Sequence, residues 1–213
     1  MSTVKRNYDA SRRRQLAAES RARVLAAARV RLLRDGYAAT TIAQVAADAG
    51  VAPQTVAKQF GNKSGLVKAL FDAALVGDAD GGSLEARDPI IAIHQEPDPR
   101  RKLQMFAAAL GEMLPRTAPI QLLLRQAGSD GELATVWAGI KAGRLAGMTN
   151  VADNLAAGGH LHPDVDAEAA RDVLWTYTSP ELYELLVGER GWTNDRYREF
   201  ITAALIAALL PPS

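Results

Sequence analysis

Alanine and leucine recur at helical spacing along most of the chain, whereas alternating runs of Val, Ile and Thr are almost absent. Alternation with a period of two is typical of a half-buried strand, and recurrence every three to four residues is typical of an amphipathic helix. Alanine and leucine are also strong helix formers. The sequence therefore predicts an all-α fold, and 213 residues with a 48% apolar share are ample for a packed core.

Composition argues against several classes of protein. No cysteine occurs, which excludes a disulfide scaffold, a zinc finger and a thiol nucleophile. The basic start of the chain lacks the apolar segment of a secretory signal. The longest uncharged stretch, 200–213, is shorter than the roughly 20 apolar residues that a membrane span needs. We therefore expect a cytoplasmic protein with no membrane partner.

The charges are divided unevenly along the chain. Residues 1–68 carry thirteen Lys and Arg against four Asp and Glu, a balance of +9, whereas residues 69–213 carry twelve against twenty, a balance of −8. An excess of this size in one part of a chain indicates a polyanionic partner, with nucleic acid as the first candidate. A solvated charged face is the alternative reading.

Glycine, proline and capping residues divide the chain into three parts: a basic arm over 1–15, a head of short helices over 16–66, and a larger helical body over 67–213. Residues 1–10 are expected to be loose, and the first helix to run over about 11–34, with Leu25, Ala28 and Leu32 on its buried face. Glycines and prolines predict a hinge and loop over 77–99. Further helices are then expected over 100–114, 117–127, 130–156, 167–187 and 194–210.

Two short helices within the basic head have the proportions of a helix-turn-helix. Thr41 and Gln44 fit a capping box at the start of the first, which would end near Asp48. Gly50 permits the left-handed backbone of a tight turn. Pro53 then suits the first position of a second helix, which would end near Phe60. An ordinary helical hairpin has the same pattern, so DNA binding is one of two readings at this point.

The stretch from Tyr37 to Leu70 resembles the N-terminal domain of the TetR-family bacterial transcriptional regulators. The resemblance is carried by Thr40-Thr41-Ile42, Val45-Ala46, Ala49-Gly50-Val51, Thr55, Phe60 and Lys63. Runs at 159–166, 178–183, 190–192 and 197–210 resemble the C-terminal half of many actinobacterial members. The resemblance implies a dimeric regulator that binds double-stranded DNA through the head and a small-molecule effector through the body. No enzyme activity, cofactor or bound metal is expected.

The same resemblance implies which residues meet DNA. Thr41 and Lys63 match phosphate contacts at helix N-termini, and glutamine in the second helix can pair with adenine. The chain departs from the family pattern at Ala52, where serine usually caps the helix, and at Ala57, where tyrosine usually contacts a phosphate. The candidate DNA-binding residues are Thr41, Gln44, Pro53, Gln54, Thr55, Lys58, Gln59 and Lys63.

The basic arm adds five cations, Lys5, Arg6, Arg12, Arg13 and Arg14. They are expected to neutralise phosphates, and entry into the minor groove is possible by analogy with other basic arms. An arm with no defined contact is the alternative.

The body supplies candidates for the effector pocket and the dimer interface. Apolar and aromatic side chains of the middle helices are candidates for the pocket, although stripes of this kind are more often plain core: Met105, Phe106, Met113, Leu123, Trp137, Ile140, Met148 and Trp175. Their character suggests an apolar or aromatic effector. Apolar stripes on the last helices are candidates for the interface, or for the protomer's own core: Leu174, Tyr177, Leu182, Leu185, Ile201, Leu205 and Leu209.

The predicted function is a repressor that binds a palindromic operator as a dimer and is released by its effector. An activator, or a regulator without an effector, would use the same DNA-binding residues. A helical ligand-binding or interaction protein without DNA binding is a further alternative, motivated by Ala52 and Ala57. No catalytic motif occurs. His160 and His162 are expected to lie in a loop, with Asp166 capping the next helix rather than binding a metal.

Overall fold

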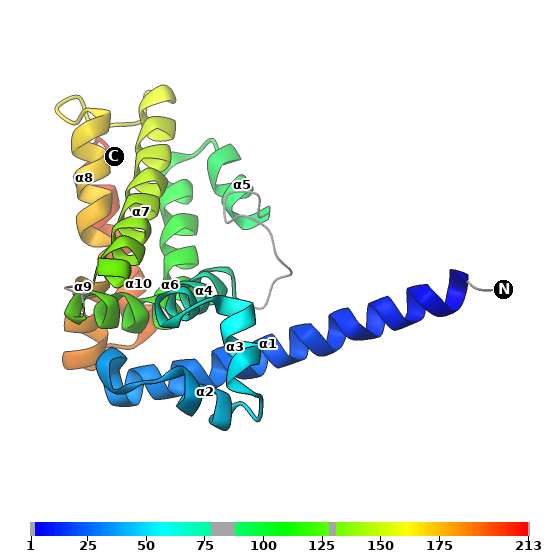
Figure 1. The fold of residues 1–213 in the computed structure, drawn as a ribbon. Coiled ribbons are helices and arrows are strands. Elements are labelled where there is room, and N and C mark those ends of the chain that lie inside the picture. The colour runs from blue at the N-terminus through cyan, green and yellow to red at the C-terminus, as the bar shows by residue number, and fades with distance from the viewer. Residues whose placement is uncertain (1–2, 78–87, 128–130, 213) are drawn as a thin grey trace. The chain divides into compact units, whose positions relative to one another are not determined.

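The computed structural model describes residues 3–77, 88–127 and 131–212, and the side chains of all of these except 3–11, 13, 14 and 88. Every regular element in these ranges is a helix (Figure 1). The chain forms two compact units, Met1–Asp72 and Ala73–Ser213, called here the amino-terminal and carboxy-terminal units. The all-α prediction is confirmed. The predicted end of the head, at residue 66, lies within a helix that crosses the boundary between the units.

The amino-terminal unit begins with a long helix, α1 (Thr3–Ala39). The loose arm predicted over 1–10 is wrong for the backbone from Thr3 onward, which is helical and continues as one rod past the neighbouring helices (Figure 1). The physical reason is composition, because no glycine or proline interrupts the run of alanine, arginine and glutamine before Gly36. Gly36 has φ 82° and leaves the helical conformation inside this element.

Short helices follow α1 as predicted: α2 (Ile42–Asp48), α3 (Pro53–Phe60) and the start of α4 (Lys63–Val76). Gly50, in the turn between α2 and α3, has φ 64°, a conformation that glycine adopts without strain. The expected capping box is present, since the Thr41 hydroxyl accepts from the Gln44 N–H and the Gln44 side chain accepts from the Thr41 N–H. These local signals therefore set the helix boundaries.

The core of the amino-terminal unit joins α1 to the two short helices. Leu25 was expected on the buried face of α1, but it is half-buried, and Val24 occupies the core instead. The other two expected residues, Ala28 and Leu32, are buried as predicted, so only the first position of this face differs. The side chains of this core are Val24, Ala28, Leu32, Val45, Ala46, Val56 and Phe60.

The carboxy-terminal unit holds the rest of the helices: α5 (Asp88–Gln95), α6 (Pro99–Gln126), α7 (Gly131–Ala157), α8 (Ala167–Tyr177), α9 (Pro180–Tyr183), the π-helical η2 (Glu184–Glu189) and α10 (Asn194–Leu209). The loop predicted over 77–99 is wrong at α5, which buries Ile93; residues 78–87 of that loop lie outside the described ranges. None of the described helices is both long and apolar enough to cross a bilayer.

The helices predicted over 100–114 and 117–127 are a single helix, α6, which continues through Pro115 and Pro119. Proline has no N–H, so Pro115 leaves the carbonyl of Gly111 without its helical donor. Asn194, at the start of α10, fills that position: its Nδ2 donates to the Gly111 oxygen over 2.8 Å. The backbone acceptor that Pro115 leaves at the predicted break is thus satisfied by a side chain from a distant part of the sequence.

The helix predicted over 167–187 is divided in the structure. It begins as expected, with the Asp166 side chain accepting from the Ala169 N–H, but α8 ends at Tyr177. Ser179 then caps a new helix by accepting from the Leu182 N–H, and Pro180 takes its first position. Capping chemistry therefore outweighs the continuous apolar spacing here.

Candidate nucleic-acid interface and effector cavity

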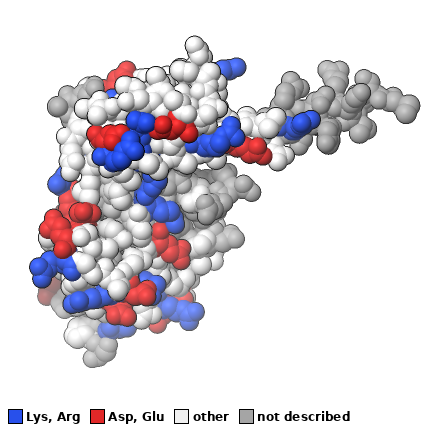
Figure 2. Space-filling model, turned by 90° about the horizontal axis from the view of Figure 1, so that it is seen from below, with Lys and Arg blue, Asp and Glu red and all other residues white. Residues whose placement is uncertain are grey.

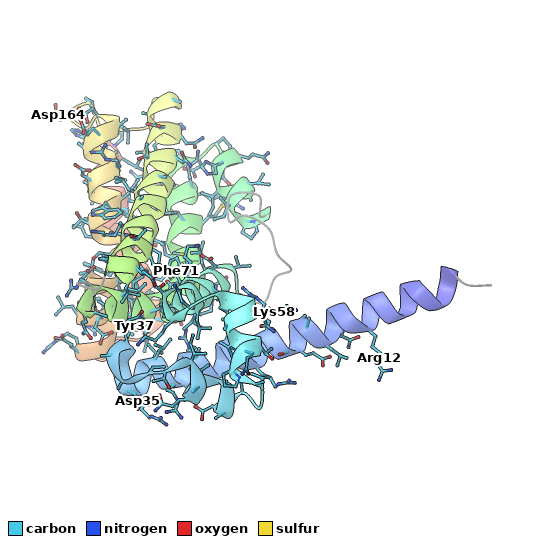
Figure 3. The ribbon with its side chains drawn as sticks, viewed as in Figure 1. Arg12, Asp35, Tyr37, Lys58, Phe71 and Asp164 are labelled. Atoms are coloured by element: carbon cyan, nitrogen blue, oxygen red, sulfur yellow. The ribbon has the colours of Figure 1, made fainter. Side chains whose placement is uncertain are left out.

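The outward face of α3 carries the exposed side chains of the helix-turn-helix. Pro53, Gln54, Ala57 and Lys58 are exposed, while Val56 is fully buried against the core (Figure 3 shows Lys58). Ala52 makes no side-chain cap, as expected for alanine, and the helix still begins at Pro53. The arrangement leaves Gln54 and Lys58, one turn apart, on an accessible face.

Two other α3 candidates are less accessible. Thr55 is half-buried. Gln59 is also half-buried, and its Oε1 atom is buried without a hydrogen-bond partner among the described residues. In this conformation the carbonyl end of Gln59 is directed into the protein, so Gln54 is the better placed of the two glutamines to meet a base edge.

Lys63 holds two segments of the amino-terminal unit together through contacts that are called here the Lys63 clamp. Its Nζ donates to the carbonyl oxygens of Tyr37 over 2.9 Å and of Thr40 over 3.0 Å, and it lies 4.0 Å from the centre of the Tyr37 ring. The side chain is half-buried. Lys63 thus joins the start of α4 to the segment that enters α2. Thr41 and Gln44, also candidates for DNA contact, are exposed, and their oxygens form the capping box.

An ion pair holds α1 to α2. Arg31 donates to both carboxylate oxygens of Asp48, from Nε over 2.7 Å and from Nη2 over 2.9 Å. Hydrogen bonding from Arg31 lowers the pKa of Asp48. Arg34 donates from Nε to a carboxylate oxygen of Asp35 over 2.7 Å, and this hydrogen bond lowers the pKa of Asp35. Two of the four acidic residues that offset the basic charge of residues 1–68 are therefore paired.

Basic side chains also follow α1 toward the part drawn grey, with an acidic one between them (Figure 2). Arg12 is exposed and projects from the helix (Figure 3), and the Arg21 guanidinium lies 4.7 Å from the centre of the Phe60 ring at the end of α3. The remaining arm candidates, Lys5, Arg6, Arg13 and Arg14, have side chains outside the described residues.

A cavity of about 170 Å³ lies in the carboxy-terminal unit, between the end of α4 and the helices α5, α6 and α7. Three predicted effector-binding residues line it: Phe106, Met113 and Met148. Most of the other lining residues are apolar, and Glu112, Arg116, His94 and Asn150 add polar groups. The cavity suits a compact, largely apolar molecule.

Five predicted pocket residues do not line this cavity. Ile140 is buried in the protein, and Trp175 is covered by Arg144, whose guanidinium lies 3.4 Å from the centre of its ring. Arg144 also donates to the Trp175 carbonyl over 2.8 Å, and burial lowers the pKa of Arg144 to about 10. Trp175 thus contacts a half-buried cation. The residues outside the cavity are Met105, Leu123, Trp137, Ile140 and Trp175.

Sequence reasoning missed the cavity walls from α4 and α5, namely Leu75, Pro89, Ile90, Ile93 and His94. Isoleucines that follow Pro89 were the available signal of a short amphipathic helix. Arg116 was missed as well: it lines the cavity, and its Nε donates to the carbonyl of Ala74 in the last turn of α4 over 3.0 Å. The cavity wall is therefore bonded to the end of the helix that starts at Lys63.

Comparison with known families decides the nature of the amino-terminal unit. Residues 24–70 match the model of a family described as bacterial regulatory proteins, tetR family. The chain thus carries a tetR-family domain. That match covers the helix-turn-helix, so it favours the DNA-binding reading of α2 and α3 over an ordinary helical hairpin. A comparison with curated protein sequences gives no match.

Solved structures share the fold of this chain over nearly its whole length. NalD, the secondary repressor of the MexAB-OprM multidrug efflux pump in Pseudomonas aeruginosa, is 20% identical with a TM-score of 0.73, covering 93% of this chain and 100% of its own. FadR from Bacillus subtilis, in complex with stearoyl-CoA, is 19% identical with a TM-score of 0.70, covering 87% and 97%. A putative regulator from Saccharomonospora viridis, in complex with choline, is 16% identical with a TM-score of 0.68, covering 92% and 100%.

The dimer-interface candidates of this chain fall into two groups. Four are fully buried within the protomer and so cannot meet a partner's surface: Leu174, Ile201, Leu205 and Leu209. Leu185 is 48% exposed, and Tyr177 and Leu182 are half-buried. Sequence reasoning missed Phe200, which is 37% exposed and whose ring centre lies 6.4 Å from that of Tyr177 and 5.6 Å from that of Trp192.

Polar side chains in the His160–Asp166 loop have structural roles. His162 accepts from the Asp164 N–H through Nδ1, and Asp166 caps α8 as predicted. Over the described ranges, no three His, Cys, Asp or Glu side chains lie close enough together to hold a metal ion.

Proposed function

We propose that this tetR-family protein is a transcriptional repressor that binds a palindromic operator as a homodimer and is released by a small apolar effector. The accessible face of α3 carries this proposal. Gln54 and Lys58 are exposed there, on a helix supported by α2 and by the Lys63 clamp, in the part of the chain that carries the positive charge. A short helix of this kind fits the major groove of B-DNA, which is about 12 Å wide.

Exposed apolar side chains on the last helices support dimerisation. Leu185 and Phe200 are exposed, and the rings of Tyr177 and Trp192 lie against Phe200. Aromatic residues are enriched in the cores of protein interfaces. A symmetric dimer presents two α3 helices to successive major grooves, roughly 34 Å apart, and so requires a two-fold symmetric DNA site.

The cavity supports the proposal that a small-molecule effector binds in the carboxy-terminal unit. Structures of similar fold contain stearoyl-CoA in one case and choline in another, so this fold accommodates ligands of different size. A cavity of about 170 Å³ matches a molecule of about one ring, since an engineered apolar cavity of roughly 150 Å³ takes up benzene. Arg116 lines this cavity and donates a hydrogen bond to the Ala74 carbonyl in α4, so a ligand that displaces Arg116 would alter the support of α4. An effector acts only if it favours one of two positions of α4.

Selection of duplexes from a random-sequence pool by the purified protein tests this function. We expect enrichment of inverted repeats whose half-site centres lie about one helical turn apart. Enrichment of single sites without symmetry would contradict the dimeric mode, and no enrichment would contradict DNA recognition altogether.

A further inference from the structure

The accessible face of α3 includes the methyl group of Ala57. Gln54, Ala57 and Lys58 are exposed, and their spacing of three and four residues places them on one side of the helix. Ala57 therefore lies beside Gln54 on this face, on the side away from Lys58. In the family that the chain resembles, tyrosine usually occupies this position, so its occupation by alanine is a feature of this chain.

The residues of this face match particular base edges. Glutamine pairs with the N6 and N7 atoms of adenine, lysine donates to the O6 and N7 atoms of guanine, and alanine makes apolar contact with the C5 methyl of thymine. Pro53–Phe60 contains no arginine, the commonest reader of guanine. The chemistry of α3 thus favours A·T pairs opposite Gln54 and Ala57.

Spacing along the helix fixes how these pairs are arranged. Three residues of α-helix rise about 4.5 Å, and successive base pairs of B-DNA are about 3.4 Å apart. If α3 follows the direction of the groove, Gln54 and Ala57 would therefore face neighbouring base pairs. The small side chain at Ala57 also lets the backbone of α3 approach the groove more closely than a tyrosine would.

We propose that Ala57 determines operator specificity by contacting the C5 methyl of one thymine in each half-site, next to an adenine read by Gln54. The inference rests on the proposed function, because it requires α3 to enter a major groove. It assigns to this position base readout in place of a phosphate contact.

The test uses the duplex selected by the full-length protein, with each thymine of a half-site replaced in turn by deoxyuridine, which lacks only the C5 methyl. One replacement is expected to weaken binding by about fourfold, the effect of one buried methyl-sized group. The Ala57→Gly variant should bind the thymine and deoxyuridine duplexes equally well at that position.

Ala47→Gly, at an exposed position of α2, is the matched control for the loss of a methyl group from a short helix. It should keep the fourfold difference even if its overall affinity falls. The proposal is overturned if no deoxyuridine replacement weakens binding, or if Ala57→Gly keeps the difference. Either of those outcomes leaves DNA recognition intact, whereas failure to select any duplex overturns the proposed function itself.

Discussion

Lys63 and Tyr37 are joined twice: the lysine ammonium donates to the tyrosine carbonyl over 2.9 Å and lies 4.0 Å from the centre of its ring. A second hydrogen bond, to the Thr40 carbonyl, satisfies another acceptor in the segment where α1 ends. A buried or half-buried carbonyl without a donor is costly. The residue that the family resemblance assigned to phosphate is thus engaged with the backbone that supports α2.

Replacing Lys63 with methionine is expected to destabilise the protein by about 1–3 kcal/mol, because two charge-assisted hydrogen bonds are lost. The midpoint of thermal unfolding should fall by several degrees. DNA affinity should weaken for all sequences, while the dependence of affinity on salt stays as in the wild type. Lys68→Met is the control, since its partner Asp72 is about half exposed and such pairs contribute little. An unchanged melting midpoint with a shallower salt dependence would instead assign Lys63 to a phosphate.

The Arg31–Asp48 pair predicts a pH dependence of stability. Arg31 holds the pKa of Asp48 below its ordinary value, so the folded state binds its proton less readily than the unfolded state. The stabilisation is therefore fully present above about pH 4, the usual aspartate range, and is lost as the pH falls further. Asp48→Asn removes this contribution. Denaturant unfolding at pH 7 and pH 3 should show a gap between wild type and variant that narrows in acid; a constant gap would mean that the pair does not stabilise the fold.

The proposed dimer face predicts that substitutions at two exposed leucines have different effects on dimerisation. Leu185→Glu places a charge at a 48% exposed site on η2 and should convert the dimer to a protomer of 22.8 kDa. Leu145→Glu, at a 39% exposed site on α7, should leave the mass unchanged. Sedimentation equilibrium measures both. Equal effects of the two substitutions, or a dimeric Leu185→Glu protein, would place the interface elsewhere.

Ligand binding in the cavity is tested by introducing a larger side chain that fills it. A Cβ atom added at Gly147, which lines the cavity, meets no other atom within 4 Å, and the same holds at Gly143, which does not line it. Leucine at either position should raise stability by about 0.5–1 kcal/mol, because glycine is a weak helix former. Saturating toluene should raise the melting midpoint of wild type and Gly143→Leu. Gly147→Leu should show no such rise, and a full rise in that variant would mean that the ligand binds outside the cavity.

The features that could be predicted from the sequence depend on residues close together in the chain. The features that could not be predicted depend on contacts between residues far apart in the chain. The Thr41–Gln44 box, the Gly50 turn and the Pro53 start are decided within a few residues, and the structure has each as expected. Lys63 reaches Tyr37 across 26 residues, so local spacing could not distinguish a clamp from a phosphate contact.

The same distinction explains the errors in the carboxy-terminal unit. Continuity of α6 depends on Asn194 reaching Gly111 across 83 residues. Trp175 appeared to be a pocket residue because its cover, Arg144, comes from another helix. The fold class and the outward face of α3 follow from periodicity and caps, whereas the cavity and the interface depend on which helices meet.

The most direct test of DNA recognition by α3 is the affinity for the selected duplex at 50 and 200 mM salt, measured for the wild type and for a Gln54→Ala, Lys58→Ala double variant. If α3 and the basic residues around it bind the duplex, the wild type should lose affinity on the order of 10³-fold between the two conditions. The double variant should bind the selected and random duplexes equally. Salt-insensitive binding of micromolar or weaker affinity, the same in both proteins, would show that α3 does not read DNA.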